Sequence, residues 1–369
     1  MGGPLESAGG GARAAGPEAL RARLARLRAP RGDVPAAQPP MLATLVDRVP
    51  GDPGWLFEVK YDGVRVIARR AGARVTLAGR NGQDFTPRYP ELVEALRALP
   101  IERFVLDGEI VAVDERGRPS FQRLQNRMHL THPLDVERAR ETVPVSAVFF
   151  DALALDGHDL RALPLTERKA CLALVLPSRG IVRHGDQVAG DGEAFLAAAA
   201  ERQLEGIVAK KADSAYGAGR SRDWLKIKCQ LRQEFVIGGW TDPQGSRPYF
   251  GALHLGLYED GRLAYVAKVG TGFDEKTLAL VWRKLGALAR ATSPFAAGSP
   301  RGRGHHWVEP RLVCEVRFTE WTEDGGIRHP AFLGLRDDKR PEDCRRETPR
   351  PVAGAPASPT RAPGAPPPA

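Results

Sequence analysis

Cysteine is scarce in this chain of 369 residues, and its four positions are scattered. No two of them form a Cys-x-x-Cys pair, so a zinc finger and a disulfide framework are both disfavoured. Long apolar runs are also missing. No stretch approaches the roughly 18 residues that cross a membrane, and the N-terminus lacks the hydrophobic core of a secretion signal. These absences predict a soluble protein of a reducing, cytoplasmic compartment with no membrane partner.

Negative charge is in deficit: 54 Lys and Arg residues stand against 45 Asp and Glu residues, which leaves a net charge of +9. Such a balance favours a polyanionic partner, although many basic proteins bind none. The length is sufficient for two domains, each with its own hydrophobic core.

Residues 1–38 are rich in Gly, Ala, Pro and Arg and predict a basic N-terminal arm. Within the arm, Leu20, Leu24 and Leu27 recur at helical spacing among arginines, which indicates a short amphipathic helix. The interpretation we favour is a solvated arm. An auxiliary contact to a nucleic-acid backbone and an organelle transit peptide are the alternatives.

From residue 39 to 231, short strand-like runs alternate with helical ones, which predicts an α+β domain. From 232 to 340 the pattern changes to short strands with one helical piece, and this fits a small β-barrel. Residues 341–369 have no apolar periodicity and are rich in Pro, Ala and Arg. They predict a disordered tail whose removal leaves the function nearly unchanged.

The first domain is organised around residues 57–65, which predict a strand that runs into a turn at Asp62-Gly63. Period two places Glu58 and Lys60 on one polar face of the strand. A lysine held in this way can act as a nucleophile if its pKa falls from about 10.4 to near neutrality. Burial and neighbouring positive charges would lower it, so we expect such neighbours elsewhere in the chain. The alternative is an ordinary lysine of an edge strand.

Charged residues recur where the predicted strands would bury them. Arg80 follows a strand and opens an Arg-Asn-Gly turn. Asp107 and Glu109 would share one strand face, which is costly unless they meet a metal, a ribose or a cation. Lys226 and Lys228 also share a face and require an anion, for which a triphosphate is suitable. These two lysines are the positive neighbours that the nucleophile requires.

With its flanks, Lys60-Tyr61-Asp62-Gly63 resembles the adenylated-lysine motif of the covalent nucleotidyltransferases, which include ATP-dependent DNA ligases, RNA ligases and mRNA capping enzymes. Five further stretches follow in the order of that family, and such an ordered set is hard to obtain by chance. They are Arg80-Asn81-Gly82, Asp107-Gly108-Glu109, Phe149-Phe150-Asp151, Glu205-Gly206-Ile207-Val208-Ala209-Lys210-Lys211 and Trp224-Leu225-Lys226-Ile227-Lys228.

Residues 40–339 are most similar to the ligase module of bacterial non-homologous end-joining DNA ligases. In the second domain the likeness is carried by residues 235–240, 267–273 and 328–339. The resemblance implies an α+β nucleotidyltransferase (ATP-grasp-like adenylation) domain followed by an all-β OB-fold barrel domain. It also implies a stand-alone ATP-dependent DNA ligase, since neither a primase-like polymerase nor a phosphoesterase module fits in a chain of this length.

The resemblance further implies a role for each matching residue. Lys60 attacks the α-phosphate of ATP and carries AMP, Phe150 stacks on adenine, Glu58 reads the adenine edge, and Mg²⁺ or Mn²⁺ is held by Glu109 and Glu205. Arg336 and Lys339 orient the departing pyrophosphate. The nucleotide-binding residues are Glu58, Arg65, Arg80, Glu109, Phe150, Lys210, Lys226, Lys228, Arg336 and Lys339, and the DNA-binding residues are Arg80 and Arg220.

The implied partners are nicked or broken duplex DNA, a Ku-type end-binding protein and separate polymerase or nuclease proteins. The ligase itself would be a monomer associated with a bacterial nucleoid. Two alternatives stay open: a capping-like or RNA-ligase nucleotidyltransferase, and a catalytically inactive clamp that binds nucleic acid through the barrel and its charge.

Overall fold

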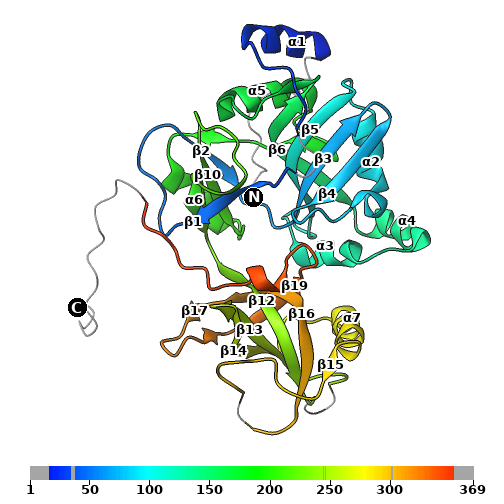
Figure 1. Cartoon of the computed structure of the whole chain (residues 1–369), viewed down its shortest axis with the longest axis vertical. Coiled ribbons are helices and arrows are strands. Elements are labelled where there is room, and N and C mark those ends of the chain that lie inside the picture. Colours follow the sequence, from blue (N-terminus) through cyan, green and yellow to red (C-terminus); the bar gives the residue numbers. More distant parts are fainter. Residues whose placement is uncertain (1–15, 35–37, 244, 246, 301, 353–369) are drawn as a thin grey trace.

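The structure is a computed structural model of the whole chain, and it describes residues 16–34, 38–243, 245, 247–300 and 302–352. Figure 1 shows two bodies stacked along the long axis of the molecule, with β12 (Leu231–Thr241) leading from the upper body into the lower one. No helix among the described residues is long and apolar enough to span a bilayer.

Two β-sheets form the upper body. In the larger one the strands lie in the order β4-β3-β5-β6-β7, with β8 beside β6, and the smaller has the order β1-β11-β10-β2-β9. The larger sheet consists of β3 (Val64–Ala71), β4 (Arg74–Gly79), β5 (Arg103–Ala112), β6 (Val145–Leu155), β7 (His158–Asp159) and β8 (Val182–His184). The smaller sheet consists of β1 (Met41–Leu45), β2 (Trp55–Val59), β9 (Val188–Ala189), β10 (Gly206–Lys211) and β11 (Gly219–Lys228).

Helices cover the sheets of the upper body, and strand alternation decides which side chains meet them. In β6, Phe149 joins a core cluster with helical leucines, whereas its neighbour Phe150 packs in a separate cluster with Trp224 of the other sheet. Successive residues of a strand point to opposite faces, so one strand serves both the helical core and the space between the sheets. The helices are η1 (Thr86–Arg88), α2 (Pro90–Arg97), α3 (Phe121–Met128), α4 (Pro133–Thr142), α5 (Leu165–Val175) and α6 (Gly192–Glu201).

The lower body has its own core, which contains Phe235, Leu255, Val281 and Val316. Its sheet has the order β14-β13-β12-β16-β15, with β19 also paired to β16. No pairing among the described strands closes this sheet completely, which agrees with the partly open barrel of the expected OB-fold. The remaining elements of this body are β13 (Leu253–Glu259), β14 (Arg262–Val269), α7 (Glu275–Gly286), β15 (Ala289–Arg290), β16 (His305–Phe318), β17 (Glu320–Trp321), β18 (Ile327–Arg328), β19 (Ala331–Leu335) and η2 (Pro341–Asp343).

The predicted N-terminal helix exists as α1 (Pro17–Arg26), but one face of it packs against the upper body, so the described part of the arm does not stand free in solvent. Leu20 and Leu24 are buried in the core that includes Leu172 of α5. Arg23 also forms an ion pair with Glu167 at 2.5 Å. The interpretation as a free arm was wrong because the leucine stripe finds an apolar partner face on α5. Residues 1–15 lie outside the described part.

Residues 341–352 are ordered, which corrects the predicted disordered tail. Cys344 and Val352 are buried, and the backbone N–H of Arg350 donates to the carbonyl of Leu45 at 3.0 Å. This order rests on backbone hydrogen bonds and two isolated apolar anchors, neither of which produces the periodicity by which sequence patterns reveal structure. The remaining tail, residues 353–369, lies outside the described part of the chain.

Candidate active site

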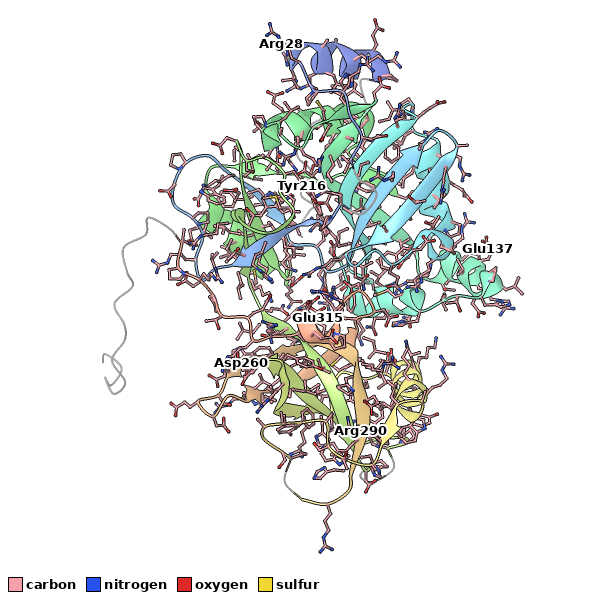
Figure 2. All side chains as sticks on the ribbon, viewed as in Figure 1. Arg28, Glu137, Tyr216, Asp260, Arg290 and Glu315 are labelled. Atoms are coloured by element: carbon pink, nitrogen blue, oxygen red, sulfur yellow. The ribbon has the colours of Figure 1, made fainter. Side chains whose placement is uncertain are left out.

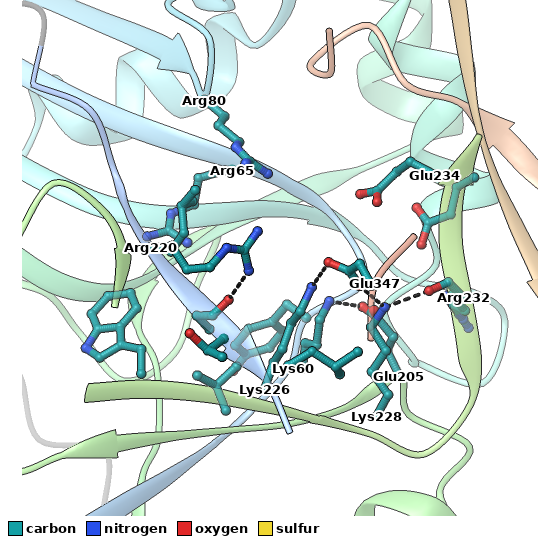
Figure 3. A pocket seen from close by; sticks show the side chains of 18 of the residues that line it. Lys60, Arg65, Arg80, Glu205, Arg220, Lys226, Lys228, Arg232, Glu234 and Glu347 are labelled. Carbon is teal, nitrogen blue, oxygen red and sulfur yellow. Dashed lines mark hydrogen bonds and ion pairs between the residues drawn. The ribbon is translucent and has the colours of Figure 1, made fainter. Parts of the chain in front are cut away.

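One cavity of about 880 Å³ lies between the two sheets of the upper body and the near edge of the lower body. Its lining includes every residue that the sequence assigned to catalysis, metal, nucleotide or DNA. These residues are Glu58, Lys60, Arg65, Arg80, Glu109, Phe150, Glu205, Lys210, Arg220, Lys226, Lys228, Arg336 and Lys339. Figure 3 shows a close view of the cavity, with Lys60 in its middle.

Lys60 is fixed by the backbone on both sides of its turn. Its N–H donates to the carbonyl of Gly206 at 2.9 Å, directly after β2 ends. Gly63 then passes so close to β5 that a Cβ atom there would stand 2.2 Å from the carbonyl oxygen of Ile110. A side chain cannot be accommodated at that approach, which is the physical reason for glycine at this turn.

The immediate partner of the Lys60 ammonium is a carboxylate, Glu205, and the two side chains form an ion pair. Burial favours the neutral amine, but the charges of Glu205, Glu315 and Glu109 outweigh it and raise the pKa of Lys60 above its usual value. The sequence predicted a lowered pKa caused by cationic neighbours. That expectation is wrong for the protein without nucleotide, because the lysines that should supply the charge are themselves neutralised.

A buried pair of lysines surrounds Glu58 at one end of the cavity. Its two carboxylate oxygens accept from Lys169 at 2.8 Å and from Lys210 at 2.7 Å. Burial raises the pKa of the Glu58 carboxyl, but these two cations outweigh it and the net shift is downward. Burial lowers the pKa of Lys210 to about 8, against the opposing charge of Glu58. Glu58 is therefore an oriented, ionised acceptor.

Phe150 forms the flat wall beside this carboxylate. The ammonium of Lys210 lies 4.1 Å from the ring centre of Phe150 and 4.1 Å from that of Trp224. The guanidinium of Arg65 lies 4.7 Å from the Phe150 ring on the cavity side of the sheet. An aromatic face bordered by cations suits a planar, electron-rich heterocycle.

Arg65 links this wall to the acidic strand β5. Its guanidinium donates two hydrogen bonds to Asp107, at 2.5 and 2.6 Å, and the hydroxyl of Tyr216 donates to the same carboxylate at 2.6 Å. Asp107 thus meets the cation that the sequence required. Its neighbour on the strand, Glu109, faces the cavity, and burial raises the pKa of that carboxyl to about 7 despite the nearby charges of Arg65 and Lys60.

Lys226 and Lys228 lie on one face of β11, as predicted, and they are bound to an anion of the chain itself. The carboxylate of Glu347 accepts from Lys226 at 2.5 Å and from Lys228 at 3.0 Å. Glu347 belongs to the segment predicted to be disordered. The sequence therefore indicated correctly that this strand needs an anion, but it did not indicate where the anion comes from.

The lower body contributes a cluster of paired charges to the cavity. Arg336 donates to Asp338 at 2.8 Å and to Glu315 at 2.6 Å, and Lys339 forms an ion pair with Glu234 at 2.6 Å. Glu315, labelled in Figure 2, lies where the two bodies meet. The charged segment at the end of β19 is therefore part of the site and not a solvated surface loop.

The two predicted DNA contacts lie toward the open side of the cavity. Arg80 follows β4 and is half-buried, and Arg220 in β11 is exposed while donating to the carbonyl of Ala43 at 2.9 Å. Both guanidinium groups are drawn in Figure 3 on the side away from Glu347.

Sequence reasoning missed several charged residues that complete the site. Lys169 lies on the buried face of α5. A lysine among the apolar residues of a helix was a usable signal, since lysine is rarely buried without a partner. Glu234 of β12 and Glu315 of β16 gave no comparable signal, because alternating charges on strands are typical of solvated faces. The missed residues are Lys169, Arg232, Glu234, Glu315, Asp338 and Glu347.

The donor set fits a divalent cation that is completed by the substrate. The described residues contain no group of three acidic, histidine or cysteine side chains able to hold a metal ion. Glu205 forms an ion pair with Lys60, and Glu109 lines the same cavity. Mg²⁺ typically binds one or two carboxylates together with substrate phosphates and water, which this pair allows.

A buried lysine paired with a carboxylate, in a cavity large enough for a nucleotide between an α+β body and a small β body, is the arrangement expected of a covalent nucleotidyltransferase. The chain belongs to the family of ATP-dependent DNA ligases. Residues 40–228 match the ATP dependent DNA ligase domain, and residues 246–339 match the ATP dependent DNA ligase C terminal region. The upper body is thus the nucleotidyltransferase domain and the lower body the OB-fold domain.

Among similar proteins, the multifunctional non-homologous end joining protein LigD of Pseudomonas aeruginosa is 43% identical over 326 residues, which cover 86% of this chain and 38% of LigD. A probable DNA ligase of Streptomyces coelicolor is 39% identical, covering 83% of this chain and 61% of that protein. A solved structure of mycobacterial DNA ligase D complexed with ATP and MES superposes with a TM-score of 0.62 and 34% identity, covering 84% of this chain and 98% of that one. The chain spans less than two-fifths of the length of the LigD relative.

Proposed function

We propose that this chain seals 5′-phosphate/3′-hydroxyl nicks or breaks in duplex DNA during non-homologous end joining, through a lysyl-AMP intermediate on Lys60. The observation that carries the proposal is the convergence of all thirteen expected residues on one cavity around Lys60. The end-joining pathway is supported by the similarity to LigD, which is named a non-homologous end joining protein.

Lys60 becomes a nucleophile by exchanging its partner. In the structure its ammonium is paired with Glu205, which holds the proton on the amine. When the ion pair with Glu205 is broken, the burial of Lys60 is no longer opposed by that carboxylate and lowers the pKa of the amine. The neutral amine attacks the α-phosphorus and a phosphorus–nitrogen bond forms. The nitrogen gives up one proton to the solvent, and pyrophosphate leaves with the electrons of the broken phosphoanhydride bond.

Mg²⁺ or Mn²⁺, held by Glu205 and Glu109, would supply positive charge to the transferring phosphate. Burial disfavours the charged form of Glu109, so this carboxyl would have to give up its proton to hold the cation.

The adenosine is placed by the groups at the other end of the cavity. Phe150 offers the stacking face, and the ionised Glu58 accepts from the exocyclic amine of adenine, which carries hydrogens that the oxygen of guanine lacks. Lys210 keeps Glu58 in place, and Arg65 binds ribose or phosphate oxygens. This arrangement favours ATP over GTP.

The OB-fold domain acts in the first step. Arg336 and Lys339 line the cavity from the lower body, where they would meet the departing pyrophosphate. Once AMP is on Lys60 the leaving group is gone, and this domain can turn away to expose Arg80 and Arg220 to the DNA. A Ku-type end-binding protein and separate polymerase or nuclease proteins are the expected partners of a monomeric, cytoplasmic ligase at the nucleoid.

Incubation with α-labelled ATP and Mg²⁺ or Mn²⁺ tests the proposal. The protein should acquire covalent label, Lys60→Ala should abolish it, and Lys60→Arg should fail equally, because a guanidinium keeps its proton. Lys276→Ala, a change at an exposed lysine of α7, is the matched control and should label normally. Label from GTP but not ATP would favour a capping-like enzyme, and absence of any label would leave only the nucleic-acid clamp.

A further inference from the structure

The segment of residues 340–352, here called the strap, crosses the mouth of the cavity from the lower body to the upper one. It is anchored to the lower body by Cys344, whose carbonyl accepts from the N–H of Tyr258 at 2.8 Å. On the upper body, the carbonyl of Pro351 accepts from Arg222 at 2.9 Å, and Val352 is buried beside the smaller sheet. The strap therefore joins both domains.

Between these anchors the strap is held mainly by Glu347. Its carboxylate bridges Lys226 and Lys228, and its N–H donates to the side-chain carbonyl of Gln233 at 3.0 Å. Burial raises the pKa of the Glu347 carboxyl, but the two lysines outweigh it and lower the pKa to about 2. Glu347 is therefore charged at every working pH.

We propose that Glu347 is a residue of the nucleotide site itself: its carboxylate occupies the phosphate position beside Lys226 and Lys228, and ATP must displace it to reach these two lysines. The proposal rests on the function proposed above for these two lysines. A carboxylate and a phosphate carry the same sign of charge and use the same ammonium donors, so both cannot occupy the position together.

Displacement has a consequence for the strap. When Glu347 leaves, its middle part, residues 345–349, loses its main contact with the upper body while the two ends remain anchored. The side chain of Arg346, 4.2 Å from the ring centre of Trp321, then fastens this part to the lower body alone. Nucleotide binding thus loosens the tie between the domains before the lower body has to turn away.

The test can also show the opposite role for Glu347, in which it supports nucleotide binding instead of competing with it. If the strap only braces the closed form in which Lys60 reacts, loss of Glu347 weakens nucleotide binding. Competition predicts instead that its loss strengthens binding. If Glu347 leaves the lysines free for only about a tenth of the time, its removal lowers the apparent KM for ATP roughly tenfold.

The experiment compares the rate of self-adenylation against ATP concentration in the full chain, Glu347→Gln and Glu342→Gln. Glu342 is exposed, lies on the same segment and is absent from the cavity lining, so its change is the matched control. We expect the KM for ATP to fall roughly tenfold in Glu347→Gln and to stay unchanged in Glu342→Gln. A KM that is unchanged or higher in Glu347→Gln overturns the proposal. Absence of label in the full chain overturns the proposed function instead.

Limited trypsin digestion gives a readout that does not depend on catalysis. Arg345 and Arg346 are exposed cleavage positions beside Glu347, and fragment masses identify cuts there. The non-reactive analogue α,β-methylene-ATP with Mg²⁺ should accelerate these cuts in the full chain, and Glu347→Gln should show fast cleavage without nucleotide. Protection of the strap by the analogue contradicts displacement.

Discussion

At the scale of single residues, Glu109 makes the stability of the nucleotide-free protein depend on pH. Its carboxyl has an ordinary pKa of 4.5 when unfolded and about 7 when folded. The folded state therefore binds more protons between these values, and stability falls as pH rises from about 4.5 to about 7. Thermal unfolding of the wild type and Glu109→Gln from pH 5 to 8 should show the wild type losing stability relative to the variant as pH rises. If the stabilities of the wild type and of the variant changed in parallel with pH, the raised pKa of the Glu109 carboxyl would be contradicted.

The sequence predicted which residues gather at the site but not how they are paired. Period two placed Lys226 and Lys228 together and required an anion, and both statements agree with the structure. The identity of that anion depends on residue 347, more than a hundred positions away in the chain, and no local pattern encodes such a contact. The direction of the pKa shift of Lys60 was predicted wrongly for the same reason. It depends on which carboxylates lie beside the ammonium in the folded protein.

At the scale of elements, the turn after Lys60 depends on the absence of a side chain at Gly63. In Gly63→Ala the new Cβ would stand 2.2 Å from the backbone oxygen of Ile110, which cannot move without distorting β5. We expect a loss of about 1–3 kcal/mol in the free energy of unfolding, measured by urea denaturation. Gly51→Ala, where nothing lies within 4 Å of the new atom, is the control and should unfold like the wild type.

The packing of α1 against α5 leads to a second prediction for a single helix. Leu24 is 1% exposed, so Leu24→Ala leaves a cavity against α5 and should cost about 2–5 kcal/mol. Arg26→Ala, on the exposed side of the same helix, should leave the unfolding midpoint nearly unchanged. Equal midpoints for the two variants would mean that α1 separates from the body in solution.

Most helices and strands of the two domains could be predicted from periodicity, including the strand that ends just before Lys60 and the strands that carry Glu109 and Lys228. Those that were missed depend on distant partners. The short strand β1 forms by parallel pairing with β11, whose residues lie far along the chain. The helix α4 has few buried side chains, so its sequence shows little apolar periodicity. Order in residues 341–352 was missed because its anchors are single residues at irregular spacing.

At the scale of the whole molecule, the position of Lys339 predicts a defect confined to one step. Lys339→Ala should slow self-adenylation about a hundredfold, because a charge that meets the developing pyrophosphate is lost. Sealing of a nick that already carries a 5′-AMP should survive. Single-turnover sealing of adenylated and plain nicked DNA by this variant provides the comparison, and an equal loss on both substrates would show that Lys339 is structural or needed throughout.

The seam between the two bodies is crossed by polar contacts, among them Asp62 with Arg232, His129 with Asp337, and Gln125 with the carbonyl of Leu335. Among the described residues, no hydrophobic cluster combines the cores of the two bodies. Dissolved salt weakens such charge pairs. It would therefore change the separation of the two domains as well as the affinity of the proposed DNA binding. A plot of log affinity against log salt would therefore mix two processes. The number of DNA phosphates inferred from its slope would be correct only after the salt dependence of domain separation, measured without DNA, had been subtracted.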